Sequence, residues 1–108
     1  MNLVKLSVEI HCNQPNWAKL QPNVVCPCYR LYLNNELITE RSWKYGDSYF
    51  INEEIYANLT VEETNKLILE PLIKIPGLAD FYLTNFSSAE REHVILSNDD
   101  LHVSFKIR

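Results

Sequence analysis

The fold is decided by the stretch Tyr29-Arg30-Leu31-Tyr32-Leu33-Asn34-Asn35-Glu36-Leu37-Ile38-Thr39-Glu40-Arg41-Ser42-Trp43. It contains two runs rich in aromatic, β-branched and other apolar residues, separated by the pair Asn34-Asn35. Runs of this kind are typical of β-strands. Asparagine tolerates the positive φ angles that a two-residue hairpin turn requires. The stretch therefore predicts an antiparallel β-hairpin with a tight primed turn.

A two-residue period also marks both ends of the chain. Near the N-terminus, apolar and polar positions alternate: Val4, Leu6, Val8 and Ile10 against Lys5, Ser7 and Glu9. Near the C-terminus the same alternation sets four apolar residues against three polar ones: Leu101, Val103, Phe105 and Ile107 against His102, Ser104 and Lys106. Each segment is predicted to be a strand with one buried and one solvated face.

Further strands are expected between these segments, over 48–58, 66–72, 81–86 and 92–97. Glu53-Glu54, in the middle of the first of them, suggests a bulge or bend. Thr60 and Glu63 have the spacing of a capping box and suggest one helical turn before the next strand.

Prolines restrict the regular structure in two places. Pro71 confines the end of its strand to an edge or an exit, because proline cannot donate to a ladder. Residues 12–28 contain three prolines and are expected to form a long irregular loop, pinned to the core by Trp17 and Leu20.

These elements predict an all-β fold: a single antiparallel β-sandwich of seven or eight strands, jelly-roll-like, over residues 1–108. An up-and-down barrel is the alternative, which the irregular loops disfavour. A chain of 108 residues is one ordinary domain and can bury roughly two-thirds of its unfolded surface.

Charge disfavours a nucleic-acid partner, and the shortness of the apolar runs disfavours a membrane partner. The net charge is −4, and ten Lys and Arg residues are scattered along the chain, so no nucleic-acid partner is expected. The N-terminus lacks the apolar core of a signal peptide, and no apolar run is long enough to cross a bilayer. The chain is therefore expected to be made in a cytoplasm and to have no membrane partner.

Soft metal ligands occur near the N-terminus at His11, Cys12, Cys26 and Cys28. They are weak zinc candidates, because a Cys-x-Cys spacing is tight and adjacent residues of a strand point to opposite faces. Small buried thiols are the simpler interpretation, and a disulfide from Cys12 to Cys26 or Cys28 is a third. No cofactor is expected.

Other candidate sites lie near the C-terminus. His93 and His102 fall on neighbouring strands of the last hairpin, where facing imidazoles could sense pH or hold half of a metal site. Asn98-Asp99-Asp100 could ligate calcium, although these are also standard turn residues. The sequence has no nucleophile elbow and too few glycines for a phosphate loop, so no enzyme and no catalytic residue are expected.

Aromatic residues are concentrated in one part of the chain, at Trp43, Tyr45, Tyr49, Phe50 and Tyr56. Part of this set is expected to belong to the core, and core or edge packing alone could explain all of it. Adjacent residues of a strand alternate between faces, however, so Tyr49 and Phe50 cannot both point inward, and exposed rings could stack on sugars or anchor a protein contact. The hypothetical binding surface comprises the residues Trp17, Trp43, Tyr45, Tyr49 and Tyr56.

The stretch 29–43, with its Arg-apolar-Tyr strand, short Asn turn and Leu-x-Thr-Glu-Arg strand, resembles small virion-associated proteins of tailed phages, marine and cyanobacterial ones above all. The segments 52–59, 66–70 and 81–85 are similar to the strands that follow in that pattern, so the resemblance covers about 29–86. It implies a jelly-roll or carbohydrate-module-like sandwich located in the virion and transfers no functional residue.

The expected function is that of a structural protein of a bacteriophage virion, most simply a capsid decoration (cement) protein. It would bind capsid or other virion proteins through apolar and aromatic surface and sheet edges, with Leu3–Ile10 as a candidate edge and a trimer as a fitting oligomer. The alternative is a carbohydrate-binding module of a tail fibre or baseplate, with a glycan as its partner.

Overall fold

The computed structural model describes residues 2–12, 28–43, 50–73 and 81–108, and these residues form eight strands and no helix. The strands are β1 (Asn2–Cys12), β2 (Cys28–Leu33), β3 (Glu36–Ser42), β4 (Phe50–Leu59), β5 (Asn65–Ile73), β6 (Phe81–Ala89), β7 (His93–Asp99) and β8 (His102–Ile107). The expected all-β antiparallel sandwich of seven or eight strands is confirmed. The irregular loop expected around 12–28 falls largely outside the described residues.

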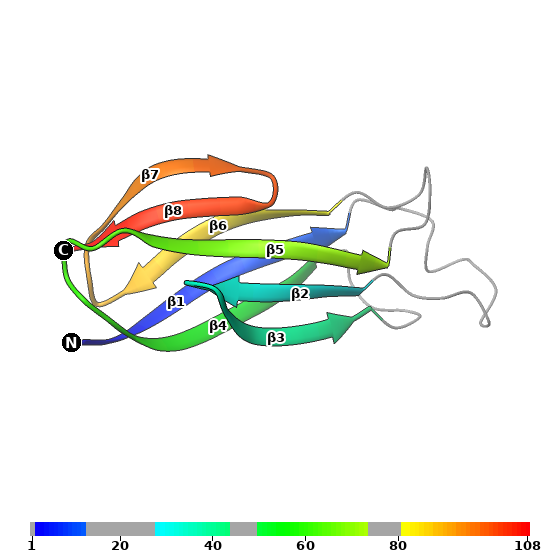
Figure 1. Cartoon of the computed structure of the whole chain (residues 1–108), viewed down its shortest axis with the longest axis horizontal. Helices are drawn as coiled ribbons and strands as arrows, with labels where there is room; N and C mark the ends of the chain where they lie inside the picture. Colours follow the sequence, from blue (N-terminus) through cyan, green and yellow to red (C-terminus); the bar gives the residue numbers. More distant parts are fainter. Residues whose placement is uncertain (1, 13–27, 44–49, 74–80) are drawn as a thin grey trace.

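The strands form two layers (Figure 1). A three-stranded sheet has the order β4-β1-β6, and a five-stranded sheet has the order β3-β2-β5-β8-β7. All strand pairs are antiparallel. Because β1 lies between β4 and β6, the prediction that Leu3–Ile10 offers a free edge is wrong. The edges are β4 and β6 in the smaller sheet and β3 and β7 in the larger one.

The predicted hairpin is formed by β2 and β3. Asn34 and Asn35 have φ angles of 51° and 68°, so both central residues adopt the positive φ of a type I′ turn. The side chain of Asn34 also ties the turn to β5, since its Nδ2 donates to Asn65 Oδ1 and its Oδ1 accepts from the Lys66 backbone N–H, each at 2.9 Å. The hairpin prediction is confirmed.

The core lies between the sheets and follows the predicted alternation at the N-terminus. Val4, Leu6, Val8 and Ile10 are each at most 1% exposed. Facing them from the larger sheet are buried residues of β2, β5 and β8: Tyr29, Leu31, Leu33, Leu67, Leu69, Val103, Phe105 and Ile107. The predicted wet face of the last strand is incomplete, because Ser104 is buried where β8 pairs with both β5 and β7.

The expected bulge at Glu53-Glu54 is wrong. The β1–β4 register runs without interruption from Asn2 opposite Leu59 to His11 opposite Phe50. Glu53 takes an inward position of the regular alternation and is 3% exposed. A carboxylate is tolerated at this position because Tyr29 and Arg41, which lie on the other sheet, both bind it. The strand therefore stays regular.

Irregularities occur instead between β2 and β5, near Pro71, and on three of the edge strands. One extra residue in β3, β6 and β7 shifts the register near Ile38, Asn85 and Leu96 respectively, and Asn85 has a φ of 53°. Bulges of this kind are frequent at sheet edges.

The helical turn expected at Thr60–Glu63 is also wrong. A reverse turn joins β4 to β5, with Glu62 at a φ of 68° and the Glu63 N–H donating to the Thr60 carbonyl at 3.4 Å. Strands separated by so few residues are joined more easily by a reverse turn than by a capped helix.

Pro71 was predicted to confine the end of its strand to an edge or an exit, and its position in β5 agrees with this. It lies beyond Ile68, the last β5 residue that pairs with β8, and beside a register shift between β5 and β2.

Candidate functional site

The aromatic residues predicted to form a binding surface are separated by the structure. Trp43 is completely buried, with its ring 5.2 Å from the Tyr29 ring and 5.7 Å from the Phe81 ring. Trp43 therefore fills the space between the sheets after β3 and is not a surface platform. Tyr56 is 62% exposed. Three members of the set lie outside the described residues: Trp17, Tyr45 and Tyr49.

The candidate metal ligands near the N-terminus do not converge. His11 and Cys12 are adjacent on β1 and point to opposite faces, with Cys12 buried in the core. Cys28 is buried at the start of β2, and Cys26 lies outside the described residues. Within the described ranges, no group of three or more His, Cys, Asp or Glu side chains is placed to hold a metal ion.

The two histidines of the last hairpin do not face each other, so that expectation is wrong. The β7–β8 register sets His93 opposite Ile107 and His102 opposite Asp99, at the two ends of the hairpin. Each ring instead lies near a serine: His93 Nδ1 is 2.8 Å from Ser88 Oγ, and His102 Nε2 is 2.7 Å from Ser104 Oγ.

The calcium candidate Asn98-Asp99-Asp100 forms the tip of the same hairpin. Asp99 Oδ1 accepts a 2.9 Å hydrogen bond from the Leu101 backbone N–H. An aspartate that bonds the backbone two residues further on is the usual side-chain brace of a turn. The polar residues at this tip are therefore explained by the turn itself, without a bound calcium ion.

A charged cluster lies at the interface between the two sheets, with Glu53 and Tyr29 buried and Arg41 half-exposed. Glu53 Oε1 accepts a 2.6 Å hydrogen bond from the Tyr29 hydroxyl and forms an ion pair with Arg41 Nε. Burial, and next the bond to Glu53, raises the pKa of Tyr29 well above its usual range. The hydrogen bond to Glu53 also raises the pKa of Arg41. Because Glu53 and Tyr29 are buried, their contacts with Arg41 and with each other can hold β2 and β3 to β4.

The outer face of the three-stranded sheet is more open to a ligand. We define it by the outward side chains of β1 (Leu3, Lys5, Ser7, Glu9, His11), β4 (Phe50, Asn52, Glu54, Tyr56, Asn58) and β6 (Tyr82, Thr84, Ser87, Ala89). Their register creates rows that cross the sheet, such as Tyr56-Lys5-Ala89 and Asn52-Glu9-Thr84. Rings therefore occur at both ends of the face, and polar groups lie between them.

One of these rows is entirely aromatic and crosses all three strands. The His11 ring lies 5.2 Å from the Phe50 ring and 4.7 Å from the Tyr82 ring, and both pairs are stacked. These separations are close to the spacing of neighbouring strands, so the register itself sets the stack. Phe50 remains 46% exposed. We call this set the aromatic row.

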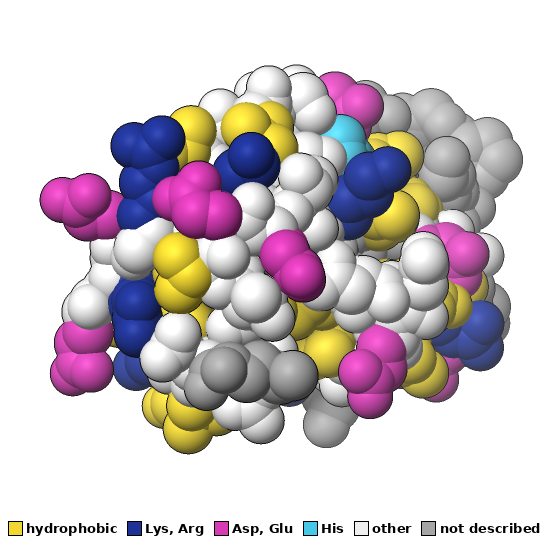
Figure 2. Space-filling view, turned by 60° about the vertical axis from the view of Figure 1, so that its left-hand side comes forward, with side chains coloured by type: hydrophobic (Ala, Val, Ile, Leu, Met, Phe, Trp, Pro, Cys, Tyr) yellow, Lys and Arg dark blue, Asp and Glu magenta, His cyan; other side chains and the backbone are white. Residues whose placement is uncertain are grey.

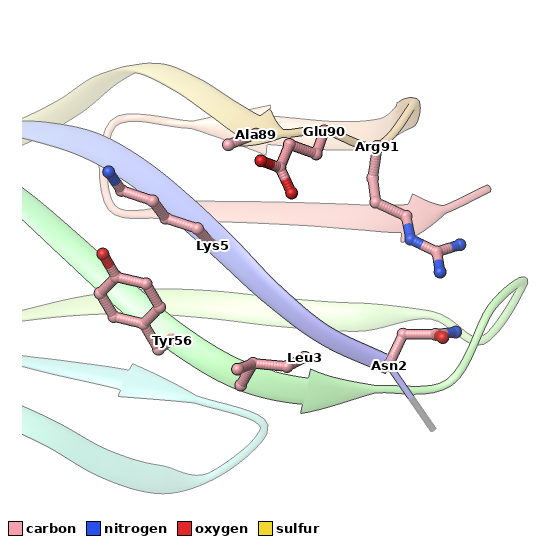
Figure 3. Close-up of a pocket in the computed structure, with 7 residues that line it drawn as sticks. All are labelled: Asn2, Leu3, Lys5, Tyr56, Ala89, Glu90 and Arg91. Carbon is pink, nitrogen blue, oxygen red and sulfur yellow. The ribbon is translucent and has the colours of Figure 1, made fainter.

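A hollow of about 580 Å³ lies at the other end of the outer face (Figure 3). It is lined by Asn2, Leu3, Lys5, Tyr56, Ala89, Glu90 and Arg91. Lys5 lies between Tyr56 of β4 and Ala89 of β6, with its Nζ 5.9 Å from the centre of the Tyr56 ring and 3.4 Å from Glu54 Oε1. The charge of Glu54, and next Tyr56, raises the pKa of Lys5. The hollow combines an exposed ring with several donors and acceptors.

The two edges of the five-stranded sheet differ in character. On β7, Val94, Ile95 and Leu96 are consecutive, and Ile95 and Leu96 are 41% and 47% exposed. We call these three residues the apolar edge. On β3, Leu37 and Ile38 are also exposed, but they lie among charged residues: Glu36, Glu40 and Arg41. Charges discourage pairing at an edge strand, so the apolar edge is the more open to another chain.

Charge is mixed over the face of the molecule that Figure 2 shows. Figure 2 shows basic and acidic side chains interspersed over one end of the molecule rather than in separate patches. In the described part of the chain, no helix has the length and apolar character needed to span a membrane.

No protein-family model, curated protein or solved structure matches the chain. Its surfaces must therefore be judged on their own chemistry.

Sequence reasoning singled out Phe50 and Tyr56 but missed their partners on the outer face. His11 was considered as a metal ligand, Lys5 was assigned only to the solvated face of its strand, and Tyr82 and Arg91 were not considered as binding residues. The alternation of β1 already indicated that Lys5 and His11 share a face, but their neighbours on β4 and β6 depend on long-range pairing.

Proposed function

We propose that this chain is a structural protein of a phage virion, a capsid decoration (cement) protein that binds a capsid protein through the apolar edge of β7. The observation that carries the proposal is the exposure of Ile95 and Leu96 on an edge strand. Burying such side chains against a partner removes apolar surface from water. Among the described residues, the outer side of β7 has no strand partner, so its backbone is available for sheet extension.

The character of the apolar edge supports this choice over the opposite side of the sandwich. From Val94 to Asn98 the strand has no charged residue, so a partner strand could pair without burying a charge. Leu96 is the extra residue of the β7 bulge and is 47% exposed, so its side chain can insert into a partner's pocket.

A cement role also agrees with the modest size of this edge. A decoration protein binds in many copies, so weak individual contacts are sufficient when neighbouring subunits are bridged. The resemblance of residues 29–86 to virion-associated phage proteins favours the same function.

Co-sedimentation with capsids assembled without this chain tests the proposal. The wild-type chain is expected to pellet with the capsids and to saturate. The double variant Ile95→Lys/Leu96→Lys should lose about tenfold or more in affinity, because charges then replace the buried apolar contact. Leu37→Lys/Ile38→Lys, which makes the same change at the β3 edge, is the matched control and should pellet like the wild type.

Two results would overturn the proposal. If the wild-type chain stays in the supernatant at every capsid concentration, it does not decorate the shell. If the β3 variant loses binding while the β7 variant keeps it, the apolar edge is not the contact. Near-ultraviolet circular dichroism of each variant shows whether it keeps the native packing.

A further inference from the structure

We infer that the outer face of the three-stranded sheet is a second binding surface, which holds an uncharged, linear polysaccharide along the strands. This goes beyond the proposed attachment to a capsid, because it uses a different sheet and a different class of ligand. A decoration protein held by its β7 edge would then leave another face free to adhere to a glycan.

The spacing of the exposed rings is the first reason. Phe50 and Tyr56 are both on β4 and both point outward, six residues apart. At roughly 3.3 Å per residue, the rings are about 20 Å apart along the strand. An extended sugar chain of several units can contact both rings, each packing against the C–H-bearing face of a sugar.

The polar groups between the rings are the second reason. The rows between Tyr56 and Phe50 contain carboxylate, amide and hydroxyl side chains, which can accept from and donate to sugar hydroxyls: Ser7, Glu9, Asn52, Glu54, Thr84 and Ser87. Glu9 is held in place, since its Oε2 accepts a 2.7 Å hydrogen bond from Asn85 Nδ2 and its Oε1 lies 3.3 Å from His11 Nε2. Polar groups fixed in this way lose little entropy when a ligand binds.

The hollow is the third reason, because it can hold a sugar unit at one end of the polysaccharide. Its volume of about 580 Å³ is within the usual range for small-molecule sites of roughly 300–1,000 Å³. In Figure 3 the Tyr56 ring lies on one side and Glu90 on the other, with Arg91 and Asn2 beyond them. One sugar unit could stack on Tyr56 while its hydroxyls reach Glu90 or Asn2.

The charges of the face decide between neutral and acidic glycans. Lys5 is already paired with Glu54, and the face with its hollow contains three carboxylates, from Glu9, Glu54 and Glu90, against the cations Lys5 and Arg91. The charges of the face are therefore nearly balanced, and Lys5, one of its two cations, is already engaged by Glu54, so little positive charge is left to hold an acidic polymer. A neutral glycan needs only hydrogen bonds and stacking.

Affinity electrophoresis of the purified chain, without any capsid, tests this inference. The gels contain a neutral polysaccharide (a β-glucan, a mannan or dextran) or an acidic one (alginate or hyaluronan). At least one neutral polymer should retard the wild-type chain, and the retardation should persist at high salt, because screening does not weaken stacking.

Substitutions on the outer face should then remove the retardation. Tyr56→Ala and Phe50→Ala should each weaken binding about tenfold, and the double variant more. Tyr32→Ala is the matched control, because Tyr32 is a partly exposed tyrosine on the outer side of the other sheet, where its hydroxyl is 3.4 Å from Glu70 Oε1. It should bind like the wild type, as should Ile95→Lys/Leu96→Lys.

Three outcomes would overturn the inference: no neutral polymer retards the chain, an acidic polymer does so in a salt-sensitive way, or the Tyr32 variant is as impaired as the Tyr56 variant. Failure here leaves the capsid result unaffected, because that experiment depends on β7. Both ring variants change exposed side chains, and matching urea midpoints would show that they remain folded.

Discussion

The ion pair of Arg41 and Glu53 joins strand β3 of one sheet to β4 of the other. Its two ends differ in environment: the Glu53 side chain is 4% exposed, whereas the Arg41 side chain is 50% exposed. The carboxylate depends on protein partners, and the guanidinium can turn to water. We therefore predict that Arg41→Met destabilises the fold much more than Glu53→Gln does.

The expected magnitudes follow from what each variant leaves behind. Arg41→Met leaves a buried carboxylate without its cation, which costs about 3–5 kcal/mol; because Tyr29 still donates to Glu53, the lower end applies, about 3 kcal/mol. Glu53→Gln keeps an acceptor for Tyr29 and leaves Arg41 to hydration. Its cost is the difference between a charged and a neutral hydrogen bond, about 1 kcal/mol.

The double variant Arg41→Met/Glu53→Gln makes the prediction sharper. It buries no charge, so it should be more stable than Arg41→Met alone, with a coupling of about 2 kcal/mol between the two sites. Urea unfolding followed by tryptophan fluorescence measures all three free energies, and the buried Trp43 reports loss of the core. The control is Arg30→Met, whose exposed pair with Glu40 should leave the midpoint unchanged.

Two results would refute this reasoning. The first is equal destabilisation by Arg41→Met and Glu53→Gln, which would mean that the carboxylate is hydrated and not enclosed by the sheets. The second is a double variant less stable than Arg41→Met, which would mean that the Arg41 stem, rather than its charge, supports the packing.

Three further predictions concern the core and the hairpin turn. Burial raises the pKa of Tyr29 above its ordinary 10.0, so the folded chain keeps a proton that the unfolded chain releases, and stability should fall as the pH rises above about 10. Urea unfolding at alkaline pH should show a shallower fall for Tyr29→Phe, and a similar slope would contradict this. Trp43→Ala should cost about 3–5 kcal/mol and Tyr56→Ala under about 0.5 kcal/mol in thermal unfolding, because the first ring is buried and the second exposed. Asn35→Gly should stabilise the fold by up to about 1 kcal/mol, since glycine suits its positive φ. Asn34→Gly should instead destabilise it by about 1–2 kcal/mol through the loss of two hydrogen bonds; equal effects in urea unfolding would show that the turn angles alone matter.

Much of the fold was predictable because its signals are local. The two-residue alternation identified β1 and β8, and Asn34-Asn35 identified the hairpin turn, since both patterns reflect the geometry of a few adjacent residues. The errors at Glu53 and Trp43 have a common cause. A buried carboxylate and a buried indole are both explained by partners from distant strands, and no local pattern contains those partners.

The candidate surfaces were only partly predictable for the same reason. Alternation puts Phe50 and Tyr56 on one face of their strand, and this much follows from the sequence. That His11 and Tyr82 complete a stacked row with Phe50 depends on the order β4-β1-β6, which no spacing in the chain reveals. The exposure of Ile95 likewise depends on β7 lying at an edge of its sheet.

The sequence by itself determined the all-β class, the inward face of β1 and the place of the tight turn, because these depend on backbone geometry and on which side chains avoid water. The tertiary structure alone decided which strands are central and which are edges, which carboxylate is paired inside the sandwich, and which rings meet on its outer face. Those properties arise from pairing between segments far apart in the chain, where register and burial are set by the packing of the whole domain.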